Sequence, residues 1–131
     1  MNGFDQEIFE KVRFHVVEAL CVEEGEVTPD ARLMDDLGAE SIDFLDIFFR
    51  VEKAFDIKLE TSASEMIHDE RYVRDGIVTD EGLEEIRRRL PHVDLGLIEE
   101  SRSVQDIQRS FTVESVVEMV KGRVGGDAGV A

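Results

Sequence analysis

The sequence has few of the residues that staple or interrupt a small fold. Its 131 residues include one cysteine, Cys21, two prolines and no tryptophan. A single cysteine excludes an internal disulfide framework and suits a reducing compartment. No apolar run approaches the length of a membrane-spanning helix, and residues 1–10 lack the pattern of a secretory signal. We therefore expect a cytoplasmic protein with no membrane span.

Basic residues are also scarce. Thirty-one acidic residues against fifteen basic ones give a formal net charge of −16. Because this charge repels phosphate backbones, no binding of nucleic acid is expected, whereas basic surfaces of partner proteins would be attracted. The hydrophobic fraction of 42% is too high for a disordered acidic chain. The length fits one domain with a packed core.

The common catalytic and metal-binding motifs are missing too. The three histidines, His15, His68 and His92, do not combine with Cys21 in any zinc-site spacing. There is no glycine-rich phosphate loop, and the acidic residues in 23–36 lack the spacing of a calcium loop. We predict no catalytic residue and no metal site, which leaves an enzyme as the least favoured function class.

Apolar residues recur at helical spacing over much of the chain, and the strand signal is poor. The pattern predicts a helix over residues 4–20, a loop over 23–39 that Leu33 and Leu37 anchor to the core, and a second helix over 41–55. A last helix should start after Thr112, followed by a flexible glycine-rich tail over 123–131. The stripe of the first helix is Phe4, Ile8, Val12 and Val16.

Residues 60–108 read as an inserted helical unit. One short helix is expected to start at Ser64 and end near Gly76, with Met66, Ile67, Tyr72 and Val73 as its apolar residues. A second should be capped by Thr79 and end at Pro91, with a loop over 92–103. We expect the apolar face of this unit, which includes Leu83, Ile86 and Leu90, to pack against the second helix.

Ser41 stands where a glycine-containing loop meets the apolar helix. The first backbone N–H groups of a helix have no partner within it, and they favour a negatively charged group such as a phosphodiester. Gly38 lets the chain turn just before this point. The alternative is that Ser41 is only the N-cap of the helix, which is the commonest role of a serine there.

The residues around Ser41 resemble the attachment signature of acyl carrier proteins, Asp-x-Gly-x-Asp-Ser-Leu. Here the signature reads Asp36-Leu37-Gly38-Ala39-Glu40-Ser41-Ile42, with Glu40 and Ile42 as mild departures. The resemblance extends over about residues 4–59 and 111–121. It implies an all-α fold: an acyl-carrier-protein-like four-helix bundle with additional inserted helices. Residues 1–122 would form one carrier domain, with the insertion at about 60–108.

The resemblance also implies a cofactor and a function. A phosphopantetheinyl transferase would attach 4′-phosphopantetheine covalently to Ser41, within the motif formed by Gly38, Glu40 and Ile42. The chain, expected to be a monomer, would carry acyl groups as thioesters and deliver them to acyl-transferring or acyl-extending enzymes with basic surfaces. The inserted unit favours a specialised lipid, lipopolysaccharide or polyketide pathway.

Partners of such carriers mostly recognise the second helix. The resemblance assigns this role to Asp43, Asp46, Arg50 and Lys53, and the two basic residues depart from the usual charge of that face. Phe44 stands where a small residue often borders the acyl pocket, which predicts a shallower pocket. The alternative from another class is a protein-interaction module with the carrier fold and no prosthetic group.

Overall fold

The computed structural model describes residues 3–59, 68–89, 93 and 95–130. The chain forms two compact units. We call Met1–Leu59 with Thr112–Ala131 the main unit, and Glu60–Phe111 the inserted unit. Within these described ranges the fold is mostly helical, as predicted, and no helix is both long and apolar enough to cross a membrane.

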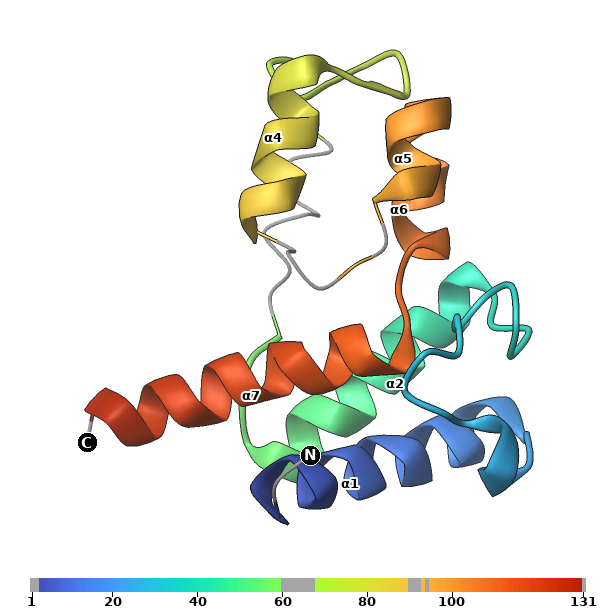
Figure 1. Cartoon of the computed structure of the whole chain (residues 1–131), viewed down its shortest axis with the longest axis vertical. Helices are drawn as coiled ribbons and strands as arrows, with labels where there is room; N and C mark the ends of the chain where they lie inside the picture. The colour runs from blue at the N-terminus through green and yellow to red at the C-terminus, as the bar shows by residue number, and fades with distance from the viewer. Residues whose placement is uncertain (1–2, 60–67, 90–92, 94, 131) are drawn as a thin grey trace. The chain divides into compact units, whose positions relative to one another are not determined.

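The main unit consists of α1 (Gly3–Leu20), a short 3₁₀ helix η1 (Glu24–Glu26), α2 (Ser41–Phe55) and α7 (Val113–Val130). Helix α1 packs against both α2 and α7 (Figure 1). The first two helices have the bounds that their apolar periodicity predicts, to within one residue. Their stripes meet in a core with no exposed surface: Val12, Val16, Leu33, Ile47, Val51, Val113, Val116 and Val120.

The loop between α1 and α2 is fixed at both of its predicted anchors. Leu33 and Leu37 are buried, which confirms that prediction. The loop is also tied to the start of α7, because the Val113 N–H donates to the Ala31 carbonyl oxygen at 3.0 Å. This tie holds the segment that leads to Ser41 against the far end of the chain.

Helix α7 begins as the sequence predicts and extends further than expected. The Thr112 hydroxyl oxygen accepts the Ser115 N–H at 3.1 Å, so Thr112 caps the helix. The helix then continues to Val130, through the segment predicted as a tail. Glycine costs about 1 kcal/mol relative to alanine in a helix interior. Because several glycines lie in this stretch, the flexibility of residues 123–131 stays a prediction.

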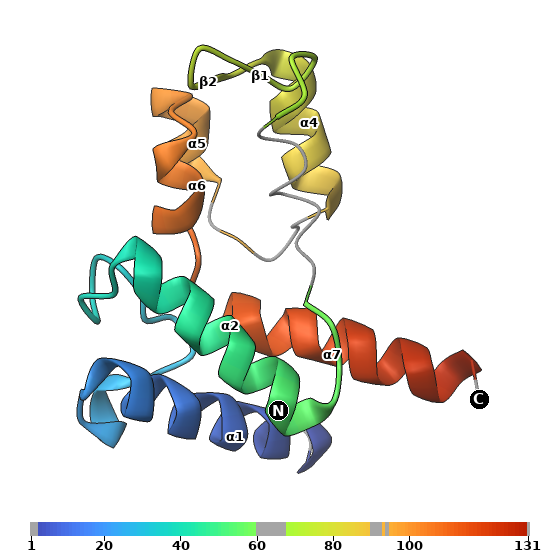
Figure 2. The same ribbon diagram turned by 180° about the vertical axis from the view of Figure 1, so that it is seen from behind.

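The inserted unit contains a small hairpin and three short helices (Figure 2). Strands β1 (Val73–Arg74) and β2 (Ile77–Val78) pair antiparallel, and α4 (Asp80–Arg89), α5 (Gly96–Ser101) and α6 (Gln105–Arg109) follow. Residues from every one of these elements are buried, which gives the segment its own set of core positions. They are Val73, Val78, Leu83, Ile86, Ile98 and Ile107.

Two expectations for the inserted unit are wrong. The predicted helix does not reach Val73, which lies in β1; the turn residues Asp75 and Gly76 have φ values of 54° and 78°. An Asp-Gly pair with positive φ values is typical of a two-residue hairpin turn. Helices α5 and α6 also occupy much of the segment predicted as a loop. Met66, Ile67, Leu90 and His92 lie outside the described residues, and packing of the insert on α2 stays a prediction.

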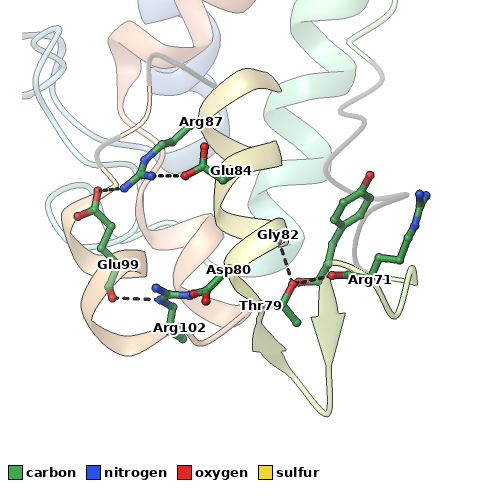
Figure 3. Close-up of polar contacts among 9 residues, drawn as sticks. Arg71, Thr79, Asp80, Gly82, Glu84, Arg87, Glu99 and Arg102 are labelled. Atoms are coloured by element: carbon green, nitrogen blue, oxygen red, sulfur yellow. Dashed lines mark hydrogen bonds and ion pairs between the residues drawn. The ribbon is translucent and has the colours of Figure 1, made fainter.

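The predicted cap of α4 is confirmed (Figure 3). The Thr79 hydroxyl oxygen accepts the Gly82 N–H at 3.0 Å and donates to the Arg71 carbonyl oxygen at 2.6 Å. A Cβ on Gly82 would lie 2.1 Å from the carbonyl oxygen of Tyr72. Only glycine lets the first turn of α4 approach the hairpin this closely.

Candidate attachment site at the start of helix α2

The loop before Ser41 is held by backbone hydrogen bonds. The Gly38 N–H donates to the Met34 carbonyl oxygen at 3.0 Å, and the Ala39 N–H donates to the Leu33 carbonyl oxygen at 2.8 Å. Gly38 has a φ of 77°, a conformation that glycine adopts without strain. No atom lies within 4 Å of where its Cβ would be. This glycine is therefore needed for the turn rather than for a close approach.

The N-cap of α2 is Glu40, not Ser41. The Glu40 N–H donates to the Asp43 carboxylate at 2.8 Å, and the Asp43 N–H donates to the Glu40 carbonyl oxygen at 2.9 Å. Ser41 is the first helical residue, and it is exposed. The alternative in which Ser41 is only the N-cap is therefore wrong, because the neighbouring residue occupies the cap position.

This arrangement fits a phosphodiester on the Ser41 oxygen. Ser41 lies in the first turn of a 15-residue helix, where the unpaired N–H groups and the helix dipole favour a negative charge. Asp36, Glu40 and Asp43 make the surroundings acidic, which favours the approach of a basic enzyme surface. In the described part of the chain, no group of three or more His, Cys, Asp or Glu side chains could hold a metal ion.

Helix α2 has two apolar faces with different surroundings. Phe44, Ile47 and Val51 are buried, and the Phe44 ring centroid lies 6.0 Å from that of Phe48. On another face, Ile42, Leu45 and Phe49 are 70%, 72% and 57% exposed. We call these three residues the exposed stripe. Sequence reasoning noted that the helix has more apolar residues than one buried face needs, and did not identify which of them face solvent.

The four predicted recognition residues are engaged within the helix or at its cap. Asp43 accepts the cap bond, and Asp46 accepts a hydrogen bond from Nε of Arg50 at 2.9 Å. The Lys53 ammonium lies 4.6 Å from the ring centroid of Phe49, at the far end of the exposed stripe. Contact of these residues with partners stays a prediction.

His15 connects α1 with the charges of α2. Burial lowers the pKa of His15, the positive charge of Arg50 lowers it further, and Glu18 opposes the shift. Its Nδ1 atom is buried, without a hydrogen-bond partner among the described residues. The neutral imidazole is thus favoured at neutral pH. His68 is exposed in the inserted unit, so the structure gives no sign that these two histidines act together.

The comparisons with known proteins point to the same segment. Residues 10–64 match the family model described as "Phosphopantetheine attachment site". A relative described as "Acyl carrier protein", from Guillardia theta, is 43% identical over 63 residues, which is 48% of this chain and 78% of the relative. The family match contains Gly38, Glu40, Ser41 and Ile42.

Proposed function

Because the chain belongs to the acyl carrier protein family, we propose that Ser41 is the residue that carries its 4′-phosphopantetheine. One observation carries this proposal: Ser41 is the exposed first residue of α2, directly after the cap residue, inside the matched segment. The group supplies, when bound, a thiol that holds acyl groups as thioesters.

The residues around Ser41 have separable roles in this proposal. Gly38 makes the turn that brings the chain to the helix start. Glu40 and Asp43 hold the cap, so modification of Ser41 would not remove the cap bonds. The N-terminal N–H groups of α2 stabilise the phosphate charge. None of these residues makes or breaks an acyl bond, which agrees with a carrier that delivers its cargo to partner enzymes.

The pathway is the finer part of the proposal. The inserted unit, Glu60–Phe111, has its own core residues and lies outside most of the family match. A second folded unit in a small carrier supports a specialised route of lipid, lipopolysaccharide or polyketide synthesis. The partners would be a phosphopantetheinyl transferase and the acyl-handling enzymes of that route.

Loading of the apo-protein tests the assignment of Ser41. We would incubate the parent chain and Ser41→Ala with coenzyme A, magnesium and a broad-specificity phosphopantetheinyl transferase, and measure intact masses. The parent should gain one phosphopantetheinyl group and the variant none. Ser41→Ala should retain the parent's helicity, because Glu40 and Asp43 provide the cap bonds. Ser101→Ala, which removes another exposed serine, should load like the parent.

The competing function is an interaction module with the carrier fold and no prosthetic group. A folded parent chain that gains no mass with the transferase would favour that function and contradict ours. Gain of mass by Ser41→Ala would contradict the assignment of the residue while leaving the family unchanged.

A further inference from the structure

We propose that enzymes acting at Ser41 dock mainly on the exposed stripe, Ile42, Leu45 and Phe49, through an apolar surface of their own. This inference rests on the proposed function and names the chemistry of the partner. It differs from the sequence-based expectation of basic partner surfaces bound through the charges of α2.

The position of the stripe carries the first step. Side chains at i, i+4 and i+8 lie on one face of a helix, so Leu45 and Phe49 continue the face on which Ser41 lies. Ile42 is the next residue along the chain. At 1.5 Å per residue, the stripe extends about 12 Å along the helix from Ser41. An enzyme that reaches the Ser41 oxygen must therefore cover Ile42 and Leu45.

The exposure of the stripe carries the second step. Exposed apolar residues scattered singly need no explanation, whereas a group of them marks an interaction site. Five large apolar side chains are exposed in the described part of the chain, and three of them belong to this one helix face. Phe14 on α1 and Ile77 on β2 are the other two.

The charges beside the stripe carry the third step. Asp46 forms an ion pair with Arg50 at 2.9 Å, and the Glu52 carboxylate accepts the Leu59 N–H at 2.8 Å. These acidic groups already have partners within the chain, so a basic partner surface would have to compete for them. Lys53, 4.6 Å from the Phe49 ring, leaves a positive charge at the end of the stripe. The matching surface is therefore apolar, with a carboxylate opposite Lys53 rather than a row of basic residues.

Kinetics of transferase loading test this inference. The broad-specificity transferase is the probe, and KM and kcat for the apo-protein are measured for the parent, Leu45→Ser, Phe49→Ser and Asp46→Asn. Each stripe variant should raise KM about tenfold with kcat retained, as for central apolar residues of an interface. Asp46→Asn should change KM less than twofold, in the range of rim charges. The matched control is Phe14→Ser, since Phe14 and Phe49 are both 57% exposed.

Salt separates apolar docking from charge docking. Screening weakens attraction between exposed charges but not apolar burial. The KM ratio of Leu45→Ser to the parent should therefore stay constant between low and high salt. A larger KM effect for Asp46→Asn than for the stripe variants would overturn the inference, and so would stripe variants that behave like Phe14→Ser.

Thermal unfolding tests whether the chain covers the stripe itself. For a stripe left open to partners, Leu45→Ser should shift the melting midpoint by no more than about 2 °C, as exposed substitutions do. A much larger drop, or a dimer that Leu45→Ser dissociates, would mean that the inserted unit or a second copy occupies the stripe. Either result would overturn the inference. A folded parent that is never loaded would overturn the proposed function as well, so the two failures are distinguishable.

Discussion

The main unit and the inserted unit are stabilised by different means. The main unit relies on long helices of 18, 15 and 18 residues, whose apolar stripes meet in a shared core. The helices of the inserted unit have 10, 6 and 5 residues. Isolated helices this short are unstable in water, so they depend on ties between elements. Three such ties are Thr79 to Arg71, Arg87 to Glu99 and Arg102 to Asp80 (Figure 3).

The surfaces of the two units differ as well. Four of the five exposed large apolar side chains in the described ranges belong to the main unit, and only Ile77 belongs to the inserted unit. Arginines of the inserted unit are paired with nearby carboxylates, as in Arg88 with Glu85 at 2.8 Å. The comparison teaches that the inserted unit satisfies most of its own surface, whereas α2 leaves an apolar face for partners.

The largest expected effect comes from a charge placed in each core. Ile47 in the main unit and Ile86 in the inserted unit are both fully buried. Replacing either by aspartate buries an unpaired carboxylate and should cost about 4 kcal/mol or more. Hydrogen exchange should show that Ile86→Asp releases the amides of α4 and α5 while α1 and α2 stay protected. Ile47→Asp should do the reverse.

The exposed isoleucine of β2 supplies the control for this pair. Ile77→Asp should leave protection in both units close to that of the parent. If Ile86→Asp and Ile47→Asp each released the amides of the whole chain, the two units would unfold as one, and the comparison would fail.

A smaller effect is expected from alanine at two glycines. Gly82→Ala would force a Cβ to within 2.1 Å of the Tyr72 carbonyl oxygen, and should destabilise the inserted unit by about 3 kcal/mol through overpacking. Gly38→Ala meets no atom within 4 Å but keeps a φ of 77°, which costs roughly 1–2 kcal/mol. Urea unfolding followed by hydrogen exchange would rank the two. A larger loss for Gly38→Ala would contradict the close approach of α4 to the hairpin.

The smallest effect concerns the pH dependence of the main unit. Burial and Arg50 lower the pKa of His15, so the folded chain binds fewer protons than the unfolded chain. Stability should therefore fall as the pH drops below the unfolded value of about 6.5, and level off below the folded pKa. His15→Gln should lose less stability than the parent between about pH 7.5 and pH 5, measured by urea unfolding.

The exposed histidine of the inserted unit is the matched control. His68→Gln should keep the parent's dependence of stability on pH, since His68 is exposed in the other unit. If His15→Gln also left the dependence unchanged, the environment assigned to His15 would be wrong.

The sequence predicted the main unit well for a physical reason. Helices of this length repeat their apolar stripe several times, so α1 and α2 were predictable to within a residue. The start of the last helix was predictable from the cap at Thr112. The hairpin was missed because strands of two residues are too short to show alternation. The Asp75-Gly76 pair was the available signal.

The attachment site was predictable in its residues but not in its details. The motif identified Ser41 and Gly38 from residue type and spacing. It did not show that Glu40 is the cap, because glutamate is not among the preferred N-cap residues, and the Asp43 carboxylate that accepts its N–H lies three positions on. The exposed stripe was not predictable either, because nearly every face of α2 is apolar. Which face is covered depends on where α1 and the loop pack.

Peptide mapping of the loaded protein tests the central claim most directly. Trypsin cleaves after Arg32 and Arg50, and in the peptide of residues 33–50 the only hydroxyl side chain is that of Ser41. After co-expression with a phosphopantetheinyl transferase, we expect the added mass on this peptide alone. A modified peptide elsewhere in the chain, or a folded protein that leaves the cell unmodified, would contradict the account.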